Sequence, residues 1–447
     1  MMKNLFIKGN AEWYSTVFRD LENRLNGQKS TDLHQLRKSA LQSFQNLGFP
    51  TTKHEEWKYT NLSSLINFNF GISDIDSSGK ISRKNIEPYQ FAGLEDRCLV
   101  FINGHFSSEL SNTKGISEQI EFLPLNEVID QNPGLLSSHF AKYTPMNEHS
   151  FISLNTAFLQ DGIYINIPEQ VNVEKPLQLL YLSVPEEKPK ASFPRNLIIV
   201  GRSSELTYIE TYASLKDGVY FTDAVSELVL QENSKGERIK IQIESNQAYH
   251  ISALKAFQDR DSRFIDHNIS FGGALTRNEI STMFKGENGV CALYGMYSGN
   301  HKQHIDNQTT IDHAISRCES HELYKGILDD SAEGVFNGKI YVRPDAQKTN
   351  AIQSNNCILL SDQATIDTKP QLEIFADDVK CTHGATVGQL NEDAYFYMRT
   401  RGIEKLDARK LLIYAFASEV VDKISIDTVR DKILDWFSEK LKTVKPQ

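Results

Sequence analysis

The chain has 447 residues, of which 40% are hydrophobic and 24% are charged, and its formal net charge is −10. This composition is typical of an ordinary soluble globular protein, and the length predicts two or three domains unless one of them is an elongated repeat. The negative charge argues against bulk electrostatic attraction to nucleic acid or to an anionic membrane.

The start of the chain, MMKNLFIKGNAEWYSTVF, lacks the apolar core of a secretory signal. No stretch approaches the roughly 20 apolar residues that cross a bilayer. We therefore expect a cytoplasmic protein that binds neither membrane nor nucleic acid. The odd number of cysteines and the absence of a CxxC pair argue against a disulfide framework and a self-contained structural zinc site. The five cysteines are Cys98, Cys291, Cys318, Cys357 and Cys381.

Residues 1–96 are predicted to form an amino-terminal helical region. Apolar residues recur there at spacings of three and four, and Gly48 followed by Pro50 is typical of a helix end. The members of this stripe are Leu33, Leu36, Ala40, Phe44 and Leu47. The next stretch, PTTKHEEWKYTNL (50–62), is predicted to be a connector whose Trp57 and Tyr59 pack against the helices.

Residues 97–390 are predicted to form a strand-rich core without long helices. In RIKIQIES (238–245) isoleucine alternates with charged or polar residues, and KIYVR (339–343) and TID (365–367) alternate over shorter lengths. Almost three hundred residues of short strands favour a β-solenoid, because a solenoid adds rungs without limit. The sequence shows no strict period. Asparagines suit the tight corners of such a coil, and the candidates are Asn350, Asn355 and Asn356.

Residues 391–447 are predicted to return to helix. One helix covers DARKLLIYAFASEVV (407–421), with an apolar face on Leu412, Ala415 and Phe416 and with Leu411 at its edge. A second helix follows, with Ser425 placed to cap it. Its apolar stripe comprises Ile426, Val429, Ile433, Trp436 and Leu441.

Cys381 and His383 are the main candidates for a functional site. They lie in ADDVKCTHGATVG (376–388), where a strand would place both side chains on one face and Thr382 on the other. A thiol and an imidazole on one face suit a soft metal, half of a nucleophilic site, or simple packing. Two ligands fall short of a closed tetrahedral metal site, so a metal would need ligands from elsewhere in the fold or from another chain.

Other polar clusters favour structural roles. Asp377 and Asp378 are adjacent, so a strand would point them to opposite faces, and a turn suits them better than a glycosidase carboxylate pair. The segment 301–322 holds four histidines and Cys318, which we expect to form exposed polar rungs, although a contribution to a metal site stays open. No GxxxxGK[ST] run occurs, so we expect the chain neither to bind nor to hydrolyse ATP.

The block EGVFNGKIYVRPDAQKTNAIQSNNCILLSDQATIDTKPQLEIFADDVKCTHGATVGQLNEDAYFYMRTRGI (333–403) closely resembles the SufB/SufD family of the SUF iron–sulfur cluster assembly machinery. The resemblance extends through HIDNQTTIDHA (304–314) and SLNTAFLQDGIYINIPE (153–169). Within the family, two segments resemble the SufD branch rather than SufB. They are FPTTKHEEWKYTNL (49–62) and the motif CTHGAT. This match shifts the interpretation of Cys381 and His383 from packing toward function.

The resemblance implies a mainly β fold, a right-handed parallel β-helix flanked by amino-terminal and carboxy-terminal helical regions. It implies a non-catalytic scaffold subunit that works with SufB and the ABC-type ATPase SufC, and SufC would contact residues 391–447. His383 would act with SufB on a transient iron–sulfur cluster or iron, beside its neighbour Cys381. No cofactor would be permanently bound, and the isolated chain could form a homodimer.

Two alternatives come from other classes of protein. The first is a β-helical carbohydrate-active enzyme, against which the missing secretion signal and the missing same-face carboxylate pair argue. The second is a purely structural scaffold in which Cys381 and His383 only pack.

Overall fold

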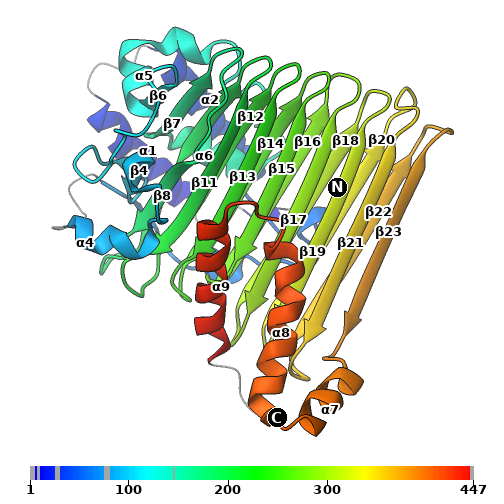
Figure 1. Cartoon of the computed structure of the whole chain (residues 1–447). Coiled ribbons are helices and arrows are strands. Elements are labelled where there is room, and N and C mark those ends of the chain that lie inside the picture. Colours follow the sequence, from blue (N-terminus) through cyan, green and yellow to red (C-terminus); the bar gives the residue numbers. More distant parts are fainter. Residues whose placement is uncertain (1–5, 8–10, 26–30, 75–80, 144–145, 443–447) are drawn as a thin grey trace.

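The polypeptide forms a parallel β-solenoid of about 8 turns with helices at both ends, in a computed structural model that describes residues 6–7, 11–25, 31–74, 81–143 and 146–442. From β10 (Arg195–Val200) onward each strand pairs in parallel with the strand two places further along the chain, as β12 (Phe221–Leu230) does with β14 (Tyr249–Gln258). Consecutive strands therefore alternate between two facing sheets (Figure 1). The predicted β-solenoid flanked by helices is confirmed.

Sheet 1 has its ladder in the order β22-β20-β18-β16-β14-β12-β10-β7-β6, and β9 and β3 join it at the side. Its strands are β3 (Gly71–Ile72), β6 (Glu121–Pro124), β7 (Gly162–Ile167), β9 (Lys190–Ser192), β10 (Arg195–Val200), β12 (Phe221–Leu230), β14 (Tyr249–Gln258), β16 (Leu275–Phe284), β18 (His304–His313), β20 (Glu333–Val342) and β22 (Thr365–Ile374).

Sheet 2 has the order β23-β21-β19-β17-β15-β13-β11-β8-β4-β5. Its strands are β4 (Cys98–Ile102), β5 (His105–Phe106), β8 (Leu177–Ser183), β11 (Glu205–Ser214), β13 (Lys235–Ile243), β15 (Arg263–Ser270), β17 (Val290–Gly299), β19 (Glu319–Leu328), β21 (Asn350–Leu359) and β23 (Lys380–Gly388). A small antiparallel pair, β1 (Phe6–Ile7) with β2 (Phe49–Pro50), lies outside both sheets.

The predicted helix in residues 33–47 is α2, and it ends as the sequence indicates. Gly48 is the C-cap, with a positive φ of 72°, and its N–H donates to the carbonyl of Phe44. Glycine adopts this backbone conformation without steric cost, which is why it ends helices. The other α-helices before the solenoid are α1 (Ala11–Arg24), α3 (Ser63–Ile66) and α4 (Arg83–Ile86), and α2 spans Asp32–Leu47. Short 3-10 helices span Glu55–Trp57, Glu87–Tyr89, Glu95–Arg97 and Pro133–Leu136.

The predicted core, residues 97–390, has no long helix among its described residues, but two short α-helices occur in it. Helices α5 (Leu125–Gln131) and α6 (Ser150–Ala157) interrupt the strands there. All eight residues of α6 are buried, so its sequence has no polar face and no helical period to detect. The division into regions 1–96, 97–390 and 391–447 stays a prediction about folding units.

The turns of the solenoid vary in length, which explains the missing sequence period. Tyr249 lies beside Leu275, 26 residues further on, whereas Glu333 lies beside Thr365, 32 residues further on. The ladders keep their register because the corners absorb the difference.

Most corners carry one residue in the left-handed backbone region. Asparagine does occupy corners, but the three asparagines proposed for them lie in strand β21 instead, so that assignment is wrong. Asn355 is buried inside the coil, where its amide donates to the hydroxyl of Thr368 at 2.8 Å. The left-handed residues at the solenoid corners are Ser203, Asn233, Asp261, Asn288, His301, Arg317, Asp330 and Lys348.

Strand β13 shows which face of the alternating pattern is inside. Its charged row lies within the solenoid, where Arg238 donates to Asp266 at 2.6 Å and to Glu210 at 3.3 Å. Its isoleucine row, Ile239 and Ile241, packs outside the coil against the carboxy-terminal helices. Buried charges are stable only when they are paired, and here each guanidinium contact is an ion pair inside the coil.

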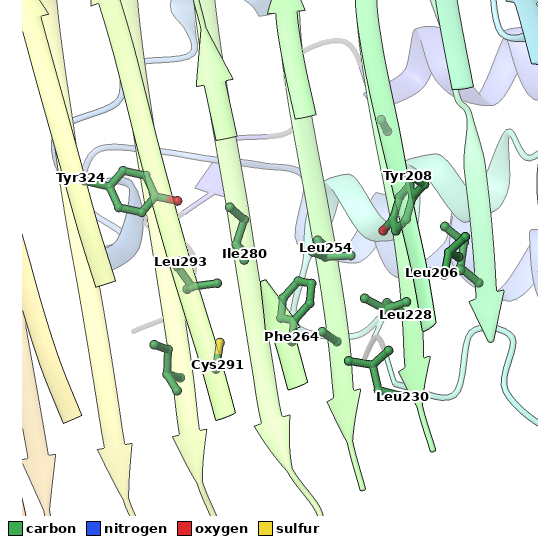
Figure 2. Packing of buried hydrophobic residues seen from close by; sticks show 14 of the residues in the cluster. Leu206, Tyr208, Leu228, Leu230, Leu254, Phe264, Ile280, Cys291, Leu293 and Tyr324 are labelled. Atoms are coloured by element: carbon green, nitrogen blue, oxygen red, sulfur yellow. The ribbon is translucent and has the colours of Figure 1, made fainter. Parts of the chain in front are cut away.

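The rest of the interior combines a large apolar cluster (Figure 2) with further buried polar side chains that hydrogen-bond to one another, as Asn268 does with Asn307. Labelled examples that meet between the two sheets are Leu228, Leu254, Phe264, Ile280 and Leu293. This cluster of buried side chains runs through the length of the solenoid and supplies most of its hydrophobic stabilisation.

Two tyrosines and two glycines interlock between neighbouring strands of sheet 2. Tyr324 lies beside Gly295, and Tyr297 lies beside Gly326. A Cβ added to Gly295 would lie 2.1 Å from the Tyr324 ring, and one added to Gly326 would lie 2.6 Å from the Tyr297 ring. Each ring therefore fills the space that a side chain on its neighbour would occupy.

The carboxy-terminal helices are α7 (Glu392–Thr400), α8 (Lys405–Val421) and α9 (Asp427–Leu441), and α8 and α9 cross the outer face of sheet 2 (Figure 1). The predicted helices are confirmed, but two details differ. The N-cap of α9 is Ile426, not Ser425, and it has no side-chain hydrogen bond. The buried face of α8 includes Ile413, Ala417 and Val420, whereas Ala415, predicted for the apolar face, is exposed, and Leu411 at its edge is 47% exposed. Contact with sheet 2, rather than the helical stripe alone, selects the buried side.

Within the described part of the chain, no helix is long and apolar enough to cross a membrane.

Candidate functional site

The candidate site lies on β23, the last strand of sheet 2. Asp377 and Asp378 form the bend that leads from β22 into this strand, as predicted. β23 pairs with β21 on one side, and among the described strands none pairs with its other edge. Figure 1 shows β22 and β23 at the end of the solenoid farthest from the amino-terminal helices. The last rung is therefore open where earlier rungs are covered.

Cys381 and His383 occupy the inward row of this open rung. In the ladder Cys381 lies beside Ala351 and His383 lies beside Gln353, and both neighbours face the interior and are almost fully buried. The predicted sharing of one face is confirmed. Thr382, between them, belongs to the opposite row.

The two candidate ligands differ in their access to solvent. Cys381 is half-buried and packs against the apolar cluster inside the coil, whereas His383 is exposed. Burial raises the pKa of the Cys381 thiol, and a backbone hydrogen bond at Ala351 opposes that rise. The thiol must lose its proton to bind a metal, so metal binding there would release a proton.

The described residues contain no group of three or more histidine, cysteine, aspartate or glutamate side chains arranged to hold a metal ion. Among the described residues, Cys381 and His383 would therefore supply at most two ligands. Thiolate and imidazole are ligands for iron and iron–sulfur clusters, which commonly take four. The remaining ligands would have to come from a partner at the open rung.

The histidines of residues 301–322 do not form a second site in the described structure. His301 lies at a corner, and His304 contacts the Thr60 hydroxyl at 2.9 Å and the Glu333 carboxylate at 3.1 Å. His313 is buried, and burial lowers its pKa to about 3. The expectation of exposed polar rungs is therefore wrong for His313 and for Cys318, because their side chains face the apolar interior.

The amino-terminal segment 49–62 contacts the outer face of sheet 1. Trp57 packs in one buried cluster with residues of α1 and α2, as predicted, and its ring lies 5.3 Å from the Phe151 ring of α6. It also stacks on the Arg277 guanidinium of β16 at 3.7 Å. Thr60 donates to Asp306 at 2.5 Å. This segment ties the amino-terminal helices to the solenoid and lies on the outer face, away from the inward row of Cys381.

Two buried residues behind His383 escaped the sequence reasoning. Gln353 lies beside His383, and Glu322 lies beside Gln353, so the three side chains form one column across the last three rungs of sheet 2. Glu322 and Gln353 are 0% and 1% exposed. Burial raises the pKa of Glu322 from 4.5 to about 7, although the hydrogen bond from Gln353 opposes the rise. Strand alternation marks both as possible inward residues, but only the register aligns them with His383.

Comparisons with known proteins cover nearly the whole chain. Residues 8–179 match the model of the SufBD protein amino-terminal region, and residues 182–416 match the SufBD core domain of the SUF system for FeS cluster assembly. A Synechocystis iron–sulfur cluster assembly SufBD family protein is 32% identical, over 92% of this chain and 91% of its own.

Two relatives that carry the SufD name are similar over most of their length. The iron–sulfur cluster assembly protein SufD of Escherichia coli is 32% identical, over 90% of this chain and 91% of its own. The SufD protein of Bacillus subtilis is 27% identical, over 92% of this chain and 94% of its own.

Proposed function

Because the chain belongs to the SufB/SufD family of the SUF iron–sulfur cluster assembly system, we propose that it is the scaffold subunit of a SufBCD-type complex. In that role it helps form or hold a nascent iron–sulfur cluster and supports iron acquisition. The main observation in favour of this role is the open last rung, where Cys381 and His383 share an inward face. A carbohydrate-active β-helix is not favoured, because the relatives are named as cluster-assembly proteins.

The iron or cluster is the cargo of this site and not a resident cofactor. A thiolate and an imidazole suit iron, and incomplete ligation by one chain would keep a cluster easy to pass on. The structure supports this role with a half-buried Cys381 next to an exposed His383. Such a pair combines a sheltered ligand with one that an incoming partner can reach.

SufB is the partner that we propose for the open end of the solenoid. The outer edges of β22 and β23 expose backbone groups that another strand can pair with. Apolar side chains are exposed at the same end, with Phe375 at 58% and Val387 at 45%. A second copy of this chain could occupy the same edges when SufB is absent, which would give a homodimer.

SufC is the partner that we propose for the carboxy-terminal helices. Phe437 of α9 is fully buried against sheet 2, where its ring lies 5.8 Å from that of Phe271. The surface left for a partner is on α7 and the start of α8, where Phe396 is 70% exposed and Tyr397 is 58% exposed. ATP hydrolysis would belong to SufC. We expect calorimetry of the isolated chain to detect no ATP binding, and measurable affinity would contradict this.

Anaerobic reconstitution with iron and sulfide tests the site directly. We expect His383→Ala and Cys381→Ser to lower cluster formation with SufB and SufC by about tenfold or more, with unchanged thermal unfolding, because they remove ligands and not core volume. Thr382→Ala is the matched control, since it changes the opposite face of the same strand. A loss of stability from either ligand variant without an assembly defect would support the purely structural alternative.

A pull-down with SufC tests the helical surface. Interface energy concentrates in a few aromatic anchors, so Phe396→Ala with Tyr397→Ala should cost roughly 2 kcal/mol of binding, about thirtyfold in affinity. Phe375→Ala is the control, because it lies at the end of the solenoid that we assign to SufB. If SufC binds the double variant at full affinity, its contact lies elsewhere.

A further inference from the structure

A column of three side chains connects the candidate site to the interior of the coil. His383, Gln353 and Glu322 lie side by side on β23, β21 and β19. Neighbouring strands are about 4.8 Å apart, so the column extends over roughly 10 Å. Only its outer member, His383, is exposed to solvent.

The carboxamide of Gln353 is held in one orientation. Its Nε2 donates to Glu322 Oε2 at 2.6 Å. The same nitrogen lies against Gly338 on the facing strand β20, where an added Cβ would be only 2.2 Å away. Any other residue at position 338 would displace the amide, so the glycine and the carboxylate together fix the side chain of Gln353.

The other end of this amide has no partner among the described residues. Gln353 Oε1 is fully buried and accepts no hydrogen bond. A buried carbonyl without a hydrogen bond is costly, so such groups nearly always have a partner. β19 and β23 flank β21 on opposite sides. An amide that directs its nitrogen toward β19 therefore directs its oxygen toward β23 and His383.

We propose that the exposed His383 ring donates its N–H to Gln353 Oε1 in solution, both without metal and when His383 binds metal, and that Glu322 holds Gln353 in place for this. The inference rests on the proposed function, since it assigns the second ring nitrogen of His383 to iron. Metal-binding histidines usually donate their other N–H to a carbonyl or carboxylate, which fixes the tautomer and the ring plane. Gln353 is thus a positioning residue, and its neutral carbonyl adds no charge beside the ligand.

The tautomer of His383 is the first test, and it needs no metal. In the full-length protein labelled with 15N-histidine, the ring nitrogen shifts at pH 8 report which nitrogen carries the proton, and His383→Asn identifies the signal. We expect one tautomer in the wild type and a mixture in Gln353→Leu. The control is Asn356→Ala, which removes a hydrogen bond from Thr386 on the outer row of the same two strands.

Anaerobic titration with Fe(II) alone is the second test. We expect Gln353→Leu to weaken Fe(II) binding by about tenfold to a hundredfold and Asn356→Ala to leave it unchanged. If Fe(II) binds through His383 but the tautomer of His383 is the same in Gln353→Leu as in the wild type, this inference is wrong and the proposed function stands. If Gln353→Leu changes the tautomer of His383 but neither the wild type nor any variant binds Fe(II), the hydrogen bond is supported and the metal role of His383 is wrong.

If Gln353→Leu fails to fold, exchange of the His383 ring N–H with solvent in the wild type tests the hydrogen bond. A hydrogen-bonded ring N–H exchanges slowly with solvent, whereas the N–H of an exposed, unbonded imidazole exchanges fast. Slow exchange together with a single tautomer supports the bond to Gln353, and fast exchange with mixed tautomers overturns it.

Discussion

The last two rungs of sheet 2 carry the same rows of side chains in different surroundings. On β21, Ala351 and Gln353 are almost fully buried. On β23, one strand further out, Cys381 is half-buried and His383 is exposed, although they continue the same inward rows. The burial of an inward residue in this solenoid therefore depends on whether another strand lies over it.

This difference separates structural from functional polar groups. A polar side chain in an inner rung must find its partners within the protein, because water does not reach it. The same row at the open rung is accessible to solvent and, under the proposed function, to iron or a partner chain. Variants in equivalent rows should therefore affect stability in the inner rungs and binding at the last one.

The largest effect on stability is expected deep inside the coil, at Arg238. Arg238→Ala leaves the buried carboxylates of Glu210 and Asp266 without their counter-ion, which should cost about 3–5 kcal/mol in the free energy of unfolding. Urea unfolding followed by circular dichroism measures this. The control is Arg343→Ala, which breaks an ion pair with Asp312 at a solvent-exposed guanidinium and should cost about 1 kcal/mol or less. Equal losses would contradict the contrast between interior and surface.

The buried carboxyl of Glu322 should make stability depend on pH. Its pKa is raised from 4.5 to about 7, so the folded state keeps the proton that the unfolded state loses. The stability from this proton is complete below pH 4.5, falls between pH 4.5 and 7, and stays lost above pH 7, a total of about 3 kcal/mol.

Glu322→Gln should remove that part of the pH profile. Urea unfolding at pH 5 and at pH 8 should show a smaller difference for this variant than for the wild type. Glu319→Gln is the control, since Glu319 lies on the same strand with an exposed side chain. Parallel profiles for wild type and Glu322→Gln would show that Glu322 titrates normally.

The most direct comparison of the two rungs uses neighbours in one row. Gln353→Ala should cost about 1–3 kcal/mol, because it removes the amide that donates to the buried Glu322. His383→Ala should change stability by no more than about 0.5 kcal/mol, because its side chain is exposed. Thermal unfolding of the two variants in parallel is sufficient. A larger loss for His383→Ala would mean that the open rung is covered in solution.

The smallest effect is expected at the corner that precedes β23. Lys348 and Asp378 form an ion pair whose side chains are 64% and 62% exposed. Lys348→Ala should therefore cost about 0.5 kcal/mol or less, and added salt should abolish even that. A larger, salt-insensitive loss would show that this corner is more than a surface contact.

Much of the fold could be predicted from alternation and helical spacing, but not the side of each strand that is buried. RIKIQIES predicted β13 correctly, yet its charged row is inside and its isoleucines pack on α8 and α9. Which face is inside depends on elements far along the chain. The rungs themselves could not be counted, because the spacing between equivalent positions varies from 26 to 33 residues.

The candidate site was predictable in part for the same reason. Cys381 and His383 are two residues apart, so strand geometry alone places them on one face. Gln353 and Glu322 are 30 and 61 positions before His383 in the chain, and only the ladder register brings them into its column. Local spacing identifies local pairs, whereas a column across rungs requires the assembled coil.

The interlocked tyrosines and glycines of β17 and β19 have a consequence for how the coil finds its alignment. A slip of two residues between these strands would keep every inward side chain inward, so hydrophobic burial alone would not oppose it. Such a slip would separate both Tyr324 from Gly295 and Tyr297 from Gly326 and would press each aromatic ring against a neighbour that has no space for it. The two pairs therefore disfavour a two-residue shift in register between β17 and β19, which is the misaligned pairing most similar to the native one.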